Sequence, residues 1–66
     1  MVITINGKAE TIEASFLLDL LNARKIEPQM VAVELNDAMI EGNLLASTPL
    51  SEGDRVEFLF YMGGGR

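Results

Sequence analysis

The sequence contains neither cysteine nor histidine among its 66 residues. Without cysteine, the chain can form neither a disulfide framework nor a thiolate metal site. Without histidine, it lacks the most common general base and metal ligand in proteins. A domain of this length buries only about 60% of the surface that its unfolded chain exposes, which leaves little room for a deep catalytic cleft. We therefore expect one small domain that binds no metal and is not itself an enzyme.

Long apolar runs and an excess of positive charge are also missing. No apolar segment approaches the roughly 20 residues needed to cross a bilayer, and the N-terminus lacks the basic region of a signal peptide. Five basic residues stand against 10 acidic ones, so the net charge is −5 at pH 7. The phosphates of a nucleic acid would repel such a chain. We expect a cytoplasmic protein with neither nucleic-acid nor membrane partners, whose acidity serves either solubility or attraction to a basic partner surface.

The N-terminal part of the chain predicts a hairpin followed by a helix. The β-branched segment Val2–Asn6 is typical of a strand, Asn6-Gly7 is a strong hairpin-turn signal, and Lys8–Glu13 would be the return strand at a sheet edge. Ser15 is a candidate N-cap for a helix over Phe16–Arg24. Three leucines of this helix fall on one face and are assigned to the core: Leu17, Leu20 and Leu21.

The remaining residues predict further strands and a fold class. We expect a central strand over Met30–Leu35, a turn, a short strand over Ala38–Glu41, a loop with one helical turn over Gly42–Pro49, and a last strand over Arg55–Tyr61. One helix must then cover one face of the sheet. This order predicts an α+β fold of the β-grasp (ubiquitin-like) type over residues 1–61. Its mixed sheet of four to five strands would have the first and last strands parallel at its centre.

Alternation along the strands divides the side chains between two faces. The predicted core face holds Ile3, Ile5, Val31, Val33, Val56, Phe58 and Phe60. The predicted open face holds Thr4, Ala32, Leu59, Tyr61 and Met62. Apolar residues directly before the C-terminal segment point to a docking surface, although ordinary apolar exposure is the alternative. We assign partner docking to Leu59, Tyr61, Met62 and Gly63.

Residues 62–66 are predicted to form a flexible tail that contains three consecutive glycines. Glycine has no Cβ, so an extended tail of this kind can enter a slot too narrow for other residues, and it reaches at most about 17 Å. A free carboxylate is a poor acyl donor because its negative charge repels nucleophiles, and conversion to an acyl-adenylate supplies a good leaving group. The chain has no phosphate-cradling loop, so ATP and Mg²⁺ would be bound by a partner enzyme. The alternative is a frayed terminus without function.

Several short segments carry a family resemblance in their order along the chain. They are residues 16–21 (FLLDLL), 31–36 (VAVELN), 46–50 (ASTPL), 53–57 (GDRVE) and 62–65 (MGGG). Each segment alone is a weak signal, but the ordered set covers nearly the whole chain. Together they resemble the ThiS family of sulfur carriers in the ubiquitin-like superfamily. Residues 39–42 differ from the stretch found in that family, which affects the choice of partner more than the fold.

The resemblance implies a function in which other proteins act on the C-terminus. A ThiF-like enzyme would adenylate the terminal glycine with ATP and Mg²⁺, a cysteine desulfurase relay would supply sulfur to form a thiocarboxylate, and the thiazole synthase ThiG would receive that sulfur. The modified residue would be Gly65, with Gly64 next to it in the enzyme's channel. Two alternatives are a carrier for molybdopterin or amino-acid biosynthesis and a non-covalent binding module.

Arg66 departs from the family pattern, because family members end on glycine. Its bulky cationic side chain would not fit a slot shaped for glycine. Three explanations for Arg66 remain open. It is removed by a peptidase, it is a residue left from cloning, or the chain is a degenerate paralogue.

Overall fold

The computed structural model describes residues 1–61, and the predicted tail at 62–66 lies outside them. Five strands and one α-helix follow in the predicted order, with two short 3₁₀ helices between them. The elements are β1 (Val2–Ile5), β2 (Lys8–Thr11), α1 (Leu17–Ala23), η1 (Pro28–Met30), β3 (Val31–Leu35), β4 (Ala38–Ile40), η2 (Gly42–Ser47) and β5 (Arg55–Phe60). The sheet order is β2-β1-β5-β3-β4, with β1 and β5 parallel and the other neighbours antiparallel. This confirms the predicted β-grasp arrangement.

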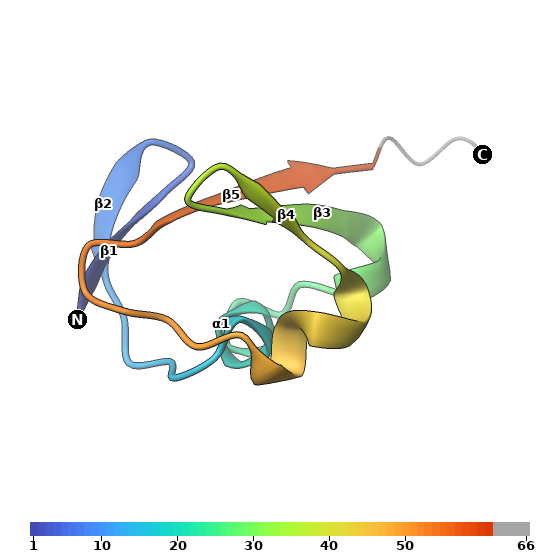
Figure 1. Ribbon diagram of the computed structural model, residues 1–66, viewed down its shortest axis with the longest axis horizontal. Helices are drawn as coiled ribbons and strands as arrows, with labels where there is room; N and C mark the ends of the chain where they lie inside the picture. The colour runs from blue at the N-terminus through green and yellow to red at the C-terminus, as the bar shows by residue number, and fades with distance from the viewer. Residues whose placement is uncertain (62–66) are drawn as a thin grey trace.

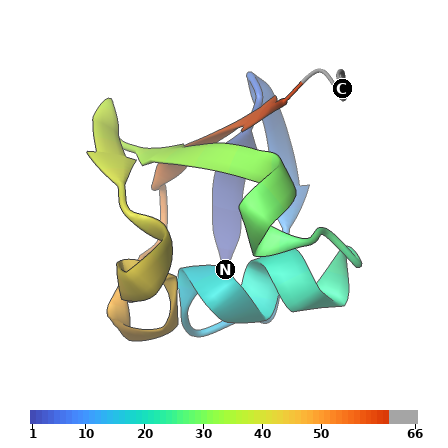
Figure 2. The same cartoon turned by 90° about the vertical axis from the view of Figure 1, so that its right-hand side faces the viewer.

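The molecule has two layers, and only one face of the sheet is covered. Figures 1 and 2 show α1 and η2 on one side of the sheet, whereas no described segment lies over the other side. The core between the layers is entirely apolar, since none of the described polar or charged residues is buried. Its fully buried side chains are Ile3, Leu17, Leu20, Leu21, Val33, Leu45 and Val56. The leucine stripe of the helix is therefore core, as the sequence predicts.

The two hairpin turns follow from residues that tolerate positive φ. Asn6 and Gly7, between β1 and β2, have φ of 49° and 83°. Asn36 and Asp37, between β3 and β4, have φ of 52° and 72°. Positive φ at both central residues is the requirement of a type I′ turn, whose twist matches that of the flanking strands. The Asn6-Gly7 prediction is confirmed, and Asn36-Asp37 turns the chain as expected.

The start of the helix differs from the prediction that Ser15 is its N-cap. The N-cap residue is Phe16, which has extended backbone at φ −126°, and its own side chain makes no capping hydrogen bond. Instead, the Leu17 N–H donates to the Thr48 carbonyl at 3.0 Å, and the Asp19 carboxylate accepts from the Phe16 N–H at 3.2 Å. The Thr48 carbonyl thus accepts the hydrogen bond from a backbone N–H of the first helical turn that the Ser15 hydroxyl is predicted to accept. Thr48 is distant in the sequence, so local helix propensities could not predict this bond.

One assignment to the predicted core face is wrong. Phe60 is predicted to be buried, but it is 56% exposed. The alternation along β5 is correct, since Phe58 two residues earlier is only 7% exposed. Figures 1 and 2 show that α1 crosses the direction of β5 rather than running along it, so the helix covers only part of the strand. The end of β5 therefore projects past the covering layer.

Candidate functional site

The predicted docking residues lie at the end of β5 on the uncovered face of the sheet. Leu59 is 50% exposed and stands opposite Ala32 of β3. Tyr61 is 57% exposed, and its N–H donates to the Met30 carbonyl at 3.0 Å, which continues the strand ladder by one residue. Leu59 and Tyr61 therefore present apolar area directly before residue 62. The structure places them where the prediction requires, and docking itself stays a prediction.

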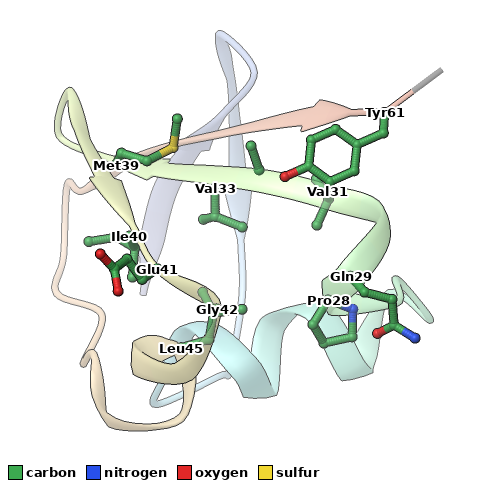
Figure 3. Close-up of a pocket in the computed structure, with 11 residues that line it drawn as sticks. Pro28, Gln29, Val31, Val33, Met39, Ile40, Glu41, Gly42, Leu45 and Tyr61 are labelled. Carbon is green, nitrogen blue, oxygen red and sulfur yellow. The ribbon is translucent and has the colours of Figure 1, made fainter.

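A pocket of about 350 Å³ opens beside this surface, where β4 separates from β3. The register explains the opening, because β4 pairs only with the C-terminal half of β3, from Val33 to Leu35. Figure 3 shows the Tyr61 ring over the start of β3 and Glu41 beside Ile40 on the other side of the pocket. Most of the lining is apolar, and its titratable groups are Glu41 and Tyr61. The pocket suits an apolar side chain of a partner rather than a nucleophile and its base.

The same face carries two glutamates, Glu34 and Glu57, which form a glutamate row next to its apolar end. Glu57 of β5 lies directly opposite Glu34 of β3, and Glu34 lies opposite Met39 of β4. Neither glutamate belongs to an ion pair within residues 1–61. Arg55 shares the face, but its guanidinium bonds the Asp37 carboxylate at 3.0 Å. Like charges directly opposite each other repel, so this face suits a partner surface that is basic as well as apolar.

The other predicted site residues cannot be placed. Met62, Gly63, Gly64 and Gly65 lie outside the described residues, so their docking and modification roles remain predictions. Within residues 1–61, no group of three or more acidic, histidine or cysteine side chains could hold a metal ion. None of the helices in the described part of the chain combines the length and apolarity needed to cross a membrane.

The structure adds residues that the sequence reading missed. Met39 is 59% exposed on the open face, and the glutamate row is new as well. The position of Met39 could have been found, because a two-residue turn at Asn36-Asp37 fixes which residues of β3 and β4 face each other. The pairing of Glu34 with Glu57 depends on the register between β3 and β5. Distant segments set that register, so no short motif reveals it.

Comparison with known proteins identifies one family over nearly the whole chain. The profile of the ThiS family matches residues 3–65. The crystal structure of the thiamine biosynthesis protein ThiS from Geobacter metallireducens superposes with a TM-score of 0.84. It shares 39% sequence identity, and the alignment covers 98% of this chain and 100% of that one.

Two curated relatives differ in how much of their own length they share. The sulfur carrier protein ThiS of Thermus thermophilus is 33% identical over 64 residues, which cover 97% of this chain and 100% of the relative. A thiazole synthase of Magnetococcus marinus is 34% identical over 67 residues, which cover 100% of this chain. The chain spans only 21% of the length of that synthase. A domain of this kind therefore occurs both alone and within a longer protein.

Proposed function

This chain belongs to the ThiS family, and on that premise we propose that it is a sulfur carrier in thiamine biosynthesis, activated at the carboxylate of Gly65. A partner enzyme of the ThiF type binds ATP and Mg²⁺, and the carboxylate attacks ATP to form an acyl-adenylate with release of pyrophosphate. The terminal sulfur of a persulfide from a cysteine desulfurase relay then displaces AMP to form an acyl disulfide, and a second thiol breaks its S–S bond, which leaves the thiocarboxylate and a new disulfide. The chain is a protein co-substrate in these steps, and Gly64 lies in the enzyme's channel beside the reacting residue.

The observation that carries the proposal is the extent of the family match, which runs through Gly65 and stops there. The arrangement of the described residues supports it. Leu59 and Tyr61, each at least half exposed, lie within six residues of Gly65 on the same strand and its continuation. A partner enzyme that docks on them would hold the glycine segment close to its own active site. Leu59, Tyr61, Met62 and Gly63 form the docking segment of this proposal.

The thiazole synthase ThiG is the proposed acceptor of the sulfur. Support comes from the Magnetococcus marinus thiazole synthase, since one fifth of that protein matches this whole chain. A segment joined to a synthase in one polypeptide remains at high effective concentration near it. If this chain and the synthase are separate proteins, they must bind each other through the same contact without the covalent link. The ThiS match also favours thiamine biosynthesis over the molybdopterin and amino-acid alternatives.

Intact mass after incubation with a ThiF-type enzyme, MgATP and sulfide tests the proposal. Two forms of the chain are compared, one ending at Gly65 and one retaining Arg66. We expect the shorter form to gain the mass difference between sulfur and oxygen, because its C-terminal carboxylate is on a glycine. The longer form should remain unmodified until a peptidase removes Arg66. Equal modification of both forms, or of neither, would contradict activation at Gly65.

A further inference from the structure

The end of β5 has a free backbone edge. β1 is parallel to β5 only over Thr4–Ile5, opposite Arg55–Val56. The chain then turns at Asn6-Gly7, and the Asn6 side-chain oxygen accepts the Phe58 N–H at 2.8 Å. Figure 1 shows β5 continuing past the β1–β2 hairpin. An interior strand thus becomes an edge strand over its last residues.

The direction of the backbone groups follows from the ladder between β3 and β5. The Tyr61 N–H donates to Met30 at 3.0 Å, and the Asn36 N–H donates to Arg55 at 2.8 Å. Hydrogen-bonded pairs alternate along an antiparallel ladder, so the odd-numbered residues of β5 bond β3. The even-numbered residues point the other way, as the bonds of Val56 and Phe58 to Asn6 confirm.

Three backbone groups consequently point away from β3 on the free edge. They are the Phe58 carbonyl, the Phe60 N–H and the Phe60 carbonyl. The β1–β5 pairing ends at Val56, and none of the three groups has a hydrogen-bond partner among residues 1–61. Their spacing along the edge matches that of the backbone groups of a neighbouring strand, so a further strand could form hydrogen bonds to all three.

This edge lacks the features by which proteins protect exposed strands. β2, at one side of the sheet, carries Lys8 and Glu10, and β4, at the other side, has only three residues. Charge and shortness are both common protections against unwanted pairing. The end of β5 is Phe-Leu-Phe, with Leu59 exposed on one face and Phe60 on the other. An unprotected apolar edge of this kind is suited to pairing with a strand of another protein.

We propose that residues 58–60 pair with a β-strand of the adenylating enzyme, which adds to the free edge of β5 directly ahead of the segment to be activated. The inference rests on the proposed function, because that enzyme must hold residues 62–65 extended, and a strand paired with residues 58–60 sets their direction. Main-chain pairing of this type is a common mode of recognising extended segments. Docking on the open face alone would leave Phe60 exposed, whereas a strand and its neighbouring layer cover both faces. Self-pairing is less suited, since it would join two chains of net charge −5.

Amide hydrogen exchange of the wild-type protein tests the pairing directly. In the free protein the Phe60 N–H should exchange rapidly, while the Leu59 N–H, which points towards β3, exchanges slowly. Addition of the adenylating enzyme should slow exchange at Phe60 by about tenfold or more, with little change at Leu59. Unchanged exchange at Phe60 in a complex that forms adenylate would overturn this inference and leave the proposed function standing. Slowing that depends on protein concentration without the enzyme would instead show self-pairing and also overturn it.

A matched pair of variants gives a second readout. Both F60P and F60A lose the aromatic ring, but only proline also removes the outward N–H. Neither loses a bond to β3. We expect the kcat/KM for adenylation to be about threefold to tenfold lower for F60P than for F60A, as one lost hydrogen bond implies. Equal values would overturn the inference. Failure of the wild type to form any adenylate would overturn the proposed function, and this inference with it.

Discussion

Replacing Leu59 and Tyr61 by alanine should weaken partner binding while leaving the fold nearly intact. Both side chains lie on the open face and are at least half exposed, at 50% and 57%. Their exposed halves contribute nothing to folding but become buried when an enzyme docks. The buried residue Val56, at 0% exposure, provides a matched control on the same strand.

The magnitude follows from the area that remains to be buried. Full burial of a large apolar side chain contributes about 1.5–3 kcal/mol, so burying the exposed half of Leu59 contributes about 1 kcal/mol. Tyr61 contributes a similar amount. L59A should lower kcat/KM for adenylation about fivefold, and the double variant L59A/Y61A about 30-fold. V56A opens a cavity in the core and should cost about 2 kcal/mol of folding free energy, which lowers the melting temperature by roughly 10 °C.

The assay measures pyrophosphate release by the adenylating enzyme at several carrier concentrations, with thermal melts of each variant in parallel. The surface variants should lower kcat/KM at temperatures where they are fully folded, although loss of the buried half of each side chain lowers the melting temperature by about 4–8 °C. V56A should show the opposite pattern, with a large loss of stability and adenylation that stays near wild type while the protein is folded. Surface variants that adenylate as well as wild type would refute the docking role. A loss of activity that only follows the loss of stability would refute it too.

Two further predictions concern the sheet. N6A removes the acceptor of the Phe58 N–H and places alanine at φ 49°, so the free energy of unfolding measured in urea should fall by about 1–3 kcal/mol; an unchanged value would contradict the role of this bond. E57Q relieves repulsion from Glu34 and should raise stability by about 0.2–1 kcal/mol, with a larger gain at low salt. E13Q is its charge-matched control away from this pair, and an equal gain in both would show a general charge effect instead.

Local sequence patterns were sufficient for most of the fold. Asn6-Gly7 and Asn36-Asp37 form the predicted turns because positive φ at both positions is a local requirement. The leucine spacing of α1 correctly identified the buried face. These features depend on neighbours within a few residues, which is the range over which a sequence is directly informative.

The errors concern features set by distant segments. Ser15 is not the N-cap, because the loop at Thr48 supplies a backbone acceptor to the helix start. Phe60 is exposed because α1 crosses the sheet and does not cover the end of β5, although its position in the alternation is correct. The candidate site shows the same division. Exposure of Leu59 and Tyr61 followed from alternation, whereas the Glu34–Glu57 pair and the free edge required the sheet register.

The central claim is that another protein activates the Gly65 carboxylate, and the mass of the C-terminal peptide tests it most directly. The chain ending at Gly65 is incubated with a ThiF-type enzyme, MgATP and sulfide, and its C-terminal fragment is then sequenced by mass spectrometry. We predict replacement of one oxygen by sulfur, located at Gly65. A fragment of unchanged mass, obtained with an enzyme that modifies a known ThiS protein under the same conditions, would contradict the claim.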